Sequence, residues 1–351
     1  LFCRVYGVTE QGNFEDVHHP RLPGEQGMNV LHLPTPLPEA AAREGISLEE
    51  LERRLAGARD VLLRERAGRT YPGLDDKVLC AWNGLMIGTM AYAGRVLDEP
   101  RYVRAAERAA DFVLQDLRRP GDARLLRTWR GGEAKIPAFL EDYSFLAGAL
   151  LDLYEATFQL RRLTEAKAIA AEMNRLFEDP EGAWRHTATD GEDLVATFRS
   201  PTDGAIPGGN GAAARVMVRL AVLGGDSDAR RRAEGAVRTF RLPMERYLGA
   251  TVGLTLALDE LLHEDGEVAV VGDPAAEGTV ALLRAVHGTF LPGTAIALLD
   301  PADGGDAARE VPLLEGKTLV DGDPAAYVCR DYACRAPVTT VDALMKALAE
   351  L

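Results

Sequence analysis

Three short polar segments carry the residues of this sequence that are best suited to chemistry. They are DDKVLCAWNG (75–84), FLEDYSF (139–145) and DGAIPGGNG (203–211). Each contains a carboxylate, a side chain that serves enzymes as a general acid or base. The predicted catalytic carboxylates are Asp76, Asp142 and Asp203. The predicted substrate-binding residues are Asp75, Lys77, Trp82, Asn83, Glu141, Tyr143, Asn210 and His32.

A sugar ring is the ligand that this mixture of side chains suits. The aromatic plane of Trp82 offers a stacking surface, and neighbouring amides and acids can bond to hydroxyl groups. A glycosidase needs two carboxylates roughly 5–10 Å apart across the bond that breaks, whereas an epimerase needs two bases on opposite faces of a ring. His32 and His186 are the histidines placed to line such a cavity. Surface or internally bonded positions are expected for the others, which are His18, His19, His263 and His287.

Each of these residues also has a purely structural interpretation. Carboxylates at helix starts stabilise the unpaired N–H groups there, by about 0.5–2 kcal/mol each. A tryptophan such as Trp82 more often belongs to a hydrophobic core than to a ligand platform, and the glycines of 203–211 fit a tight turn as well as a ligand site. The functional interpretation depends on the occurrence of three such clusters at matching places in the chain.

The elements that position these clusters repeat. An apolar helix followed by an amphipathic one is expected three times, at 77–97 and 101–117, at 138–158 and 163–179, and at 210–225 and 227–248. Loops are expected at 118–137 and 182–209. A further helix is expected at 47–69, where Ser47 and Glu50 have the spacing of a capping box. Trp82 to Asp142 spans 60 residues and Asp142 to Asn210 spans 68, which indicates repeated hairpins.

The predicted fold is therefore mainly α, an α/α-hairpin toroid over residues 1–263. The inner helices of such a ring run the same way, so the three clusters are expected to converge at one mouth. Composition changes after residue 263, and a small α/β unit is predicted over 264–351. Its strands are expected at 267–272, 294–300 and 325–332, and its helices at 273–289 and 340–351.

Composition limits the partners. The net charge of -14 would repel nucleic acid and anionic membrane surfaces. No apolar run reaches the roughly 18 residues that span a bilayer, and the first residues lack the pattern of a secretion signal. A cytoplasmic protein is expected, with a sugar as its small-molecule substrate and with no metal or cofactor. The glycines of 203–211 do not fit a phosphate-binding loop, because no strand is expected before them. The oligomeric state is not indicated.

The four cysteines are Cys3, Cys80, Cys329 and Cys334. Structural disulfides are not expected in a cytoplasmic chain. Cys329 and Cys334 are predicted to be free thiols near a strand end, with a redox or metal role as the alternative. Their separation is wider than the Cys-x2-Cys motif in which one thiol resolves the other.

Several segments resemble a known family. They are LFCRVYGVTEQGNFE (1–15), NVLHL (29–33), DDKVLCAWNGLMI (75–87), FLEDYSFLAGALLDLYEATF (139–158), DGAIPGGNGAAA (203–214) and YVCRDYACRAPV (327–338). Together they are similar to the C-terminal half of the thioredoxin-domain-containing proteins related to spermatogenesis-associated protein 20. The resemblance implies an (α/α)6 barrel of the six-hairpin glycosidase class, which includes sugar epimerases. The chain departs from the family at Gly208–Gly211, where a serine-rich SGNS is usual, and at 16–28, which has the character of an insertion.

The resemblance also implies that a thioredoxin-like domain and the first barrel hairpins are missing here, and the chain begins at Leu1 within folded-looking sequence. Either the ring is incomplete or the chain is part of a longer protein. Three functions stay open. The first is a glycosidase or sugar epimerase acting at the toroid mouth, the second a non-catalytic binding module, and the third a scaffold of a protein with a redox-linked role.

Overall fold

The chain forms two compact units, Leu1–Asp75 and Asp76–Leu351. The computed structural model describes residues 1–15, 27–121, 124–191, 195–263, 266–303, 305–330 and 333–351. The division differs from the boundary expected near residue 264, because the C-terminal sheet packs against the helices of the larger unit. His18 and His19, within the predicted insertion, lie outside the described residues.

The smaller unit contains three helices, α1 (Phe2–Val5), α2 (Leu37–Glu44) and α3 (Leu48–Ala67). Ser47 precedes α3 and its side chain accepts a hydrogen bond of 3.1 Å from the backbone N–H of Glu50, which confirms the predicted start of this helix. The small core of the unit consists of Val5, Ala40, Ala41, Leu51 and Leu55.

The larger unit is built from helical hairpins. Its helices are α4 (Cys80–Val96), α5 (Pro100–Asp116), α6 (Leu140–Thr157), α7 (Leu160–Phe177), α8 (Gly209–Gly224), α9 (Ser227–Thr239), α10 (Arg241–Arg246), η1 (Leu248–Ala250) and α11 (Val252–Leu262). The helices α4, α6, α8 and α11 lie side by side in that order, and α5, α7 and α9 each pack on the inner helix before them. The three predicted hairpins and the mainly helical fold are confirmed. Helix α11, which adds a fourth inner helix, was not among the predicted elements.

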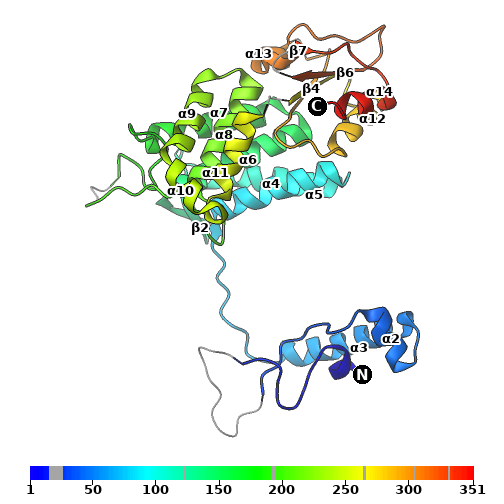
Figure 1. The fold of residues 1–351 in the computed structure, drawn as a ribbon. Coiled ribbons are helices and arrows are strands. Elements are labelled where there is room, and N and C mark those ends of the chain that lie inside the picture. Colours follow the sequence, from blue (N-terminus) through cyan, green and yellow to red (C-terminus); the bar gives the residue numbers. More distant parts are fainter. Residues whose placement is uncertain (16–26, 122–123, 192–194, 264–265, 304, 331–332) are drawn as a thin grey trace. The chain divides into compact units, whose positions relative to one another are not determined.

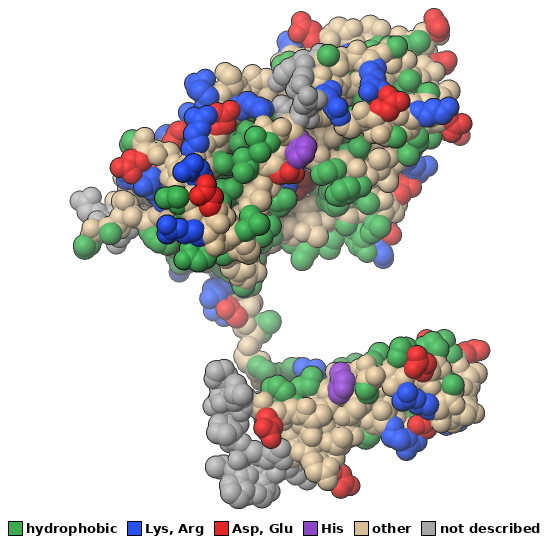
Figure 2. All heavy atoms as spheres, in the orientation of Figure 1, with side chains coloured by type: hydrophobic (Ala, Val, Ile, Leu, Met, Phe, Trp, Pro, Cys, Tyr) green, Lys and Arg blue, Asp and Glu red, His purple; other side chains and the backbone are tan. Residues whose placement is uncertain are grey.

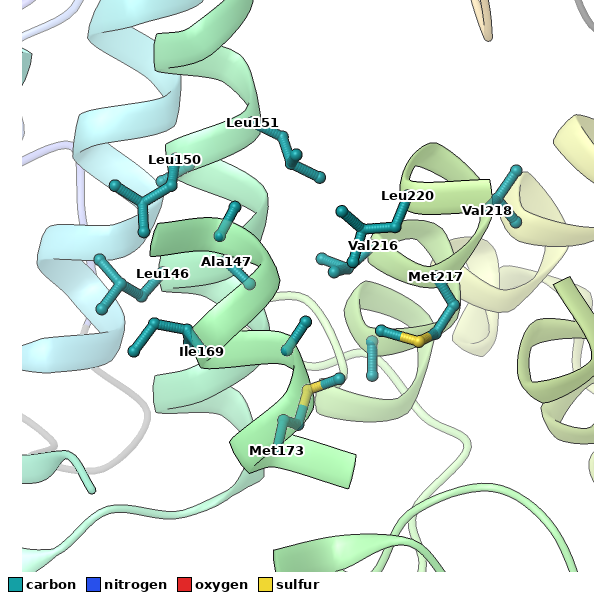
Figure 3. Close-up of a cluster of buried hydrophobic side chains, with 14 of the residues drawn as sticks. Leu146, Ala147, Leu150, Leu151, Ile169, Met173, Val216, Met217, Val218 and Leu220 are labelled. Atoms are coloured by element: carbon teal, nitrogen blue, oxygen red, sulfur yellow. The ribbon is translucent and has the colours of Figure 1, made fainter. Parts of the chain in front are cut away.

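The hydrophobic core extends between neighbouring inner helices as well as between the inner and outer helices. Leu151 of α6 points toward Val216 and Leu220 of α8, while Leu146 and Leu150 point toward α4 (Figure 3). Because α6 has neighbours on most sides, its side chains are buried almost all round. The apolar character that predicted a buried helix at 138–158 therefore comes from its central place in the row.

Glycines allow the inner helices to approach each other closely. A Cβ on Gly84 of α4 would come within 2.9 Å of the backbone of Phe145 and Leu146 in α6. A Cβ on Gly211 of α8 would come within 2.8 Å of the backbone of Gly253 in α11. No real Cβ contact to backbone is that short, so a larger residue at either position would push two inner helices apart.

The predicted loop at 118–137 is wrong. It contains the strands β2 (Leu126–Arg130) and β3 (Glu133–Pro137). Strand β2 is the centre of an antiparallel sheet, with β3 on one side and β1 (Val78–Leu79) on the other. Gly131 and Gly132 form the two-residue turn and both have positive φ, which is the geometry that favours Gly-Gly in hairpins. The turn signal was present in the sequence but the flanking strands are short and carry little apolar alternation.

The C-terminal part forms a second sheet. Its strands are β4 (Gly266–Val271), β5 (Ala295–Leu299), β6 (Ala325–Arg330) and β7 (Ala333–Cys334), and its helices are α12 (Glu277–His287), α13 (Asp306–Glu310), η2 (Pro312–Leu314) and α14 (Val341–Leu348). The strand order is β5-β4-β6-β7, with β4 and β5 parallel. One face of this sheet packs on α12 and α14 and the other on the helical body (Figure 1). The predicted strands and helices of this part are confirmed.

The expectation of two free thiols in this sheet is wrong. Cys329 of β6 and Cys334 of β7 form a disulfide bond. The two residues are direct partners in the antiparallel β6–β7 pair, which brings their side chains to the same face of the sheet. Among the described cysteines, Cys3 is free and exposed and Cys80 is free and buried. A separation of five residues did not reveal this pairing because the hairpin register was not known.

The close packing of α4 on α6 leads to a first prediction. Replacing Gly84 with Ala should lower the free energy of unfolding by about 1–2 kcal/mol, since the overpacking cost of about 1–3 kcal/mol exceeds the gain in helix propensity. Gly235→Ala on α9 is the matched control, because a Cβ there would meet nothing within 4 Å, and it should stabilise the protein slightly. Urea unfolding of both variants tests this, and equal stability of the two would contradict it.

Candidate ligand-binding face of the inner helices

Asp142 joins the first turns of two inner helices. Its Oδ1 accepts a hydrogen bond of 2.9 Å from the backbone N–H of Ala81 in α4, and its Oδ2 accepts one of 2.9 Å from Phe139 at the start of α6. Arg127 of β2 lies 3.1 Å from Oδ2. The residue has no exposed surface. These contacts favour a structural role for this predicted catalytic residue, as a cap shared by α4 and α6.

Burial raises the pKa of Asp142 to about 6, against the opposing effect of its bonds to Phe139 and Arg127. The carboxyl therefore takes up a proton more readily in the folded protein than in the unfolded chain. For the charged carboxylate, the free-energy cost of leaving water therefore exceeds the stabilisation that its hydrogen bonds and the Arg127 charge provide.

Asp203 joins the next two inner helices in the same way. Its Oδ1 accepts a hydrogen bond of 2.7 Å from the backbone N–H of Gly208, which caps α8, and its Oδ2 accepts one of 2.9 Å from Gly253 in α11. The helix N-termini that the sequence placed at one mouth are thus brought together by carboxylates. Both oxygens of this predicted catalytic residue are committed to backbone.

Two further predicted binding residues, Asn210 and Tyr143, are buried and form hydrogen bonds to the backbone of other segments. Asn210 of α8 bonds through its side chain to both backbone groups of Trp184 at 2.9 Å and to the carbonyl oxygen of Ser200 at 3.1 Å. The Tyr143 hydroxyl accepts a bond of 2.8 Å from the N–H of Leu125, and burial raises the pKa of Tyr143 to about 12. Tyr143 thus bonds the segment between α5 and α6 to the start of α6, and Asn210 bonds the segment between α7 and α8 to the start of α8.

The remaining predicted residues of the larger unit are more accessible. The Trp82 side chain is 60% exposed on α4. Asp76 is exposed and its carboxylate lies 2.5 Å from the guanidinium of Arg130. Lys77 is exposed, whereas the half-buried Asn83 donates a bond of 2.9 Å to the carbonyl oxygen of Leu79 within its own helix start. His32 and Asp75 belong to the smaller unit.

Glu141 forms a partly accessible polar cluster at the start of α6. Its carboxylate lies 3.0 Å from the guanidinium of Arg127 and 3.5 Å from Nδ1 of His186. The His186 ring stacks on Phe139 with 5.0 Å between centroids, and the Arg127 guanidinium lies 4.9 Å from the same ring. The structure therefore brings His186 close to one predicted binding residue, Glu141.

A second polar group occupies the other half of the inner helices and was missed by sequence reasoning. We call it the charged row, defined as Arg95 of α4, Asp152 and Glu155 of α6, Arg215 and Arg219 of α8, and Glu260 of α11. Each inner helix contributes at least one member. Charged residues inside otherwise apolar helices were the signal that could have revealed it.

The ion pairs of the charged row are short. The Arg219 guanidinium lies 2.8 Å from the Asp152 carboxylate, 3.4 Å from that of Glu155, and donates to the carbonyl oxygen of Gly148 at 3.3 Å. Arg95 lies 2.7 Å from Glu155. Burial raises the pKa of Asp152 although Arg219 opposes the change, so this carboxyl holds its proton more strongly than an exposed aspartate.

Part of the charged row reaches solvent. The Asp152 side chain is 27% exposed and that of Arg215 is 44% exposed, whereas Glu155 and Arg95 are nearly buried. The larger unit is hollowed on the face seen in Figure 2, with acidic atoms in the depth of the hollow and hydrophobic side chains on both sides. Tyr92 of α4 and Leu256 of α11, at the two ends of the helix row, are partly exposed. Polar groups in the depth and apolar groups at the sides suit a small polar ligand.

A separate groove of about 770 Å³ lies elsewhere, between α7, α8 and α9. Its lining includes Lys167, Asn174, Arg175 and Arg232 and none of the predicted site residues. In the described part of the chain, no group of three or more His, Cys, Asp or Glu residues is arranged to hold a metal ion. Likewise, none of the described helices has the length and apolarity to cross a membrane.

The geometry defines a class, an array of α-helical hairpins with polar groups on its inner helices. No protein-family model matches the chain. Spermatogenesis-associated protein 20 of Homo sapiens is 32% identical over 359 residues, covering 99% of this chain and 45% of that protein. An uncharacterised protein of Caenorhabditis elegans is 27% identical, covering 97% of this chain and 47% of the relative. The chain is homologous to spermatogenesis-associated protein 20, which confirms the predicted resemblance, and it spans about half the length of the relatives it matches.

Two solved structures overlap parts of the chain. Cellobiose 2-epimerase from Bacillus thermoamylovorans has a TM-score of 0.41 at 15% identity, covering 48% of this chain and 46% of its own. An α-mannanase of Bacteroides thetaiotaomicron has a TM-score of 0.40 at 15% identity, covering 64% of each chain. Both superpositions are partial.

The shared cap at Asp142 leads to a prediction about pH. Because its pKa is raised on folding from 3.8 to about 6, its contribution to stability is present below pH 4 and decreases as the pH rises through 6. The shift corresponds to about 3 kcal/mol. The difference in unfolding free energy between the wild type and Asp142→Asn should therefore fall between pH 4 and pH 6. Urea unfolding at several pH values measures it, and a constant difference would contradict the argument.

The two backbone hydrogen bonds that Asp203 accepts, from Gly208 and Gly253, lead to a second prediction for this region. Replacing Asp203 with Asn leaves one of two backbone N–H groups without its acceptor and should lower the unfolding free energy by about 1–3 kcal/mol. Asp76→Asn is the matched control, since the exposed ion pair of Asp76 should contribute less than about 1 kcal/mol. Thermal unfolding of both variants compares them. Similar losses would show that Asp203 does not act as a cap.

Proposed function

We propose that the hollowed face of the inner helices binds a sugar-sized polyhydroxylated small molecule. The observation that carries the proposal is the exposed part of the charged row, in which Asp152 and Arg219 of the two central inner helices are paired at 2.8 Å. Tyr92 and Leu256, on the two outermost inner helices, are also exposed. Carboxylates and guanidinium groups offer acceptors and donors to hydroxyls, and an aromatic ring offers a stacking surface. This places the principal contacts farther along the helices than the three sequence motifs.

Trp82 and the cluster of Glu141 with His186 are proposed as secondary contacts toward the helix N-termini. Trp82 is exposed on the same helix as Tyr92, and Glu141 precedes Asp152 on α6 by eleven residues, or about 16 Å of helix rise. That length exceeds a single sugar ring. A chain of two or more rings along α6 would be needed to contact both regions.

Binding is tested by calorimetry with a panel of mono- and disaccharides that includes glucose, mannose and cellobiose. Tyr92→Ala should weaken binding at least tenfold, which is about 1.4 kcal/mol. Phe290→Ala is the matched control, because this aromatic residue is exposed in the C-terminal part and does not belong to the inner helices. Absence of binding at millimolar concentrations, or equal binding by both variants, would reject the proposal.

Catalysis is a narrower proposal and has its own test. The raised pKa of Asp152 makes it a candidate general acid. In contrast, the two oxygens of Asp142 and of Asp203 bond to backbone N–H groups, which leaves their expected catalytic roles with less support. For a saccharide that binds, product analysis should show turnover by the wild type and none by Asp152→Asn, with binding retained within a few fold. Binding without turnover by the wild type would favour the non-catalytic module.

A further inference from the structure

The Cys329–Cys334 bond lies at the edge of the C-terminal sheet. Strand β7 has only two residues and is the last strand in the order β5-β4-β6-β7. Cys334 is exposed, whereas Cys329 is 1% exposed and packs in the core cluster that joins the sheet to the helical body. The two cysteines therefore differ strongly in exposure to solvent, although they share one bond.

We propose that this bond is a thiol–disulfide exchange site for a dithiol reductant, with Sγ of Cys334 as the atom that is attacked. A thiolate must approach one sulfur of a disulfide directly, so access decides which sulfur reacts. No other described strand covers β7 on its outer side. The buried Cys329 then becomes the leaving group.

The exchange balances in two steps. A thiolate of the reductant forms a bond to Sγ of Cys334, the Cys329–Cys334 bond breaks, and the electron pair remains on Sγ of Cys329, which takes a proton. The second thiol of the reductant then attacks the mixed disulfide and releases Cys334 as a thiol. Two electrons and two protons pass from the dithiol to the cysteine pair, and the reductant becomes an intramolecular disulfide.

The surrounding structure can persist without the bond. Arg335 donates its backbone N–H to the carbonyl oxygen of Val328 at 3.1 Å, and Ala326 and Val338 exchange two backbone bonds of 2.8 and 3.0 Å. Arg335 also forms an ion pair with Glu350 near the C-terminus. A bond that closes a loop of so few residues removes little entropy from the unfolded chain. These contacts favour reversible opening of the Cys329–Cys334 bond in the folded protein over a disulfide that the fold requires.

Cys3 and Cys80 are free thiols whose reactivity can be compared with that of the Cys329–Cys334 pair. Cys80 is fully buried, and burial raises the pKa of its thiol, so it should not react while the protein is folded. Cys3 is exposed and free, and it should react without any reduction. A Cys3→Ser background therefore leaves the cysteine pair as the accessible source of new thiols.

The first experiment treats the folded Cys3→Ser protein with dithiothreitol and follows labelling by iodoacetamide with mass spectrometry. Label should appear on Cys334 before Cys329, with the circular dichroism spectrum unchanged, and oxidised dithiothreitol should restore the bond. The proposal is overturned if reduction occurs only at the rate of global unfolding, or if Cys329 is labelled first.

A matched pair of variants separates the two sulfurs without any reductant. In Cys329→Ser the remaining Cys334 should react with iodoacetamide at least tenfold faster than the remaining Cys329 reacts in Cys334→Ser, both in the Cys3→Ser background. Equal rates in folded protein would overturn the assignment of Cys334 as the accessible sulfur. These measurements do not depend on any ligand of the inner helices.

Discussion

The larger unit depends on the shared capping of inner-helix N-termini. Parallel helices that start side by side bring together several unpaired N–H groups and several positive dipole ends, which repel one another unless anions lie between them. Asp142 and Asp203 provide those anions, each with its two oxygens on two different segments. One carboxylate per pair of helices satisfies the donors and also fixes the helices in register, which the close contacts at Gly84 and Gly211 require.

This constraint explains why the carboxylates of two motifs of catalytic appearance bond to backbone N–H groups. A carboxylate at a helix start has the same sequence pattern whether it meets a substrate or a neighbouring backbone. The difference lies in burial and in the identity of the donors. Asp142 is fully buried and Asn210 nearly so, and neither property follows from residue type or from spacing along the chain.

The hairpin pattern was predictable because buried and amphipathic helices differ in composition, and α6 and α7 show that contrast clearly. Helix α11 was not predicted because it is short and follows the two small helical turns of α10 and η1. The Cys329–Cys334 bond and the ion pair of Asp152 with Arg219 depend on register and on helix rotation. Such quantities are set by tertiary packing, so local sequence carries only indirect signs of them, such as a charge within an apolar helix.

The two ends of the inner helices therefore carry different tasks. At the N-terminal ends, the carboxylates of Asp142 and Asp203 accept hydrogen bonds from backbone N–H groups through both oxygens. The free-energy cost of burying the Asp142 carboxylate appears in its raised pKa. Farther along, Asp152 and Arg219 are held by each other and retain exposed surface. A side chain that stabilises a helix start through both oxygens has little freedom to change partners during binding. A paired carboxylate that keeps exposed surface can exchange part of its ion pair for ligand hydroxyls, and for this reason we place the proposed binding surface at the charged row.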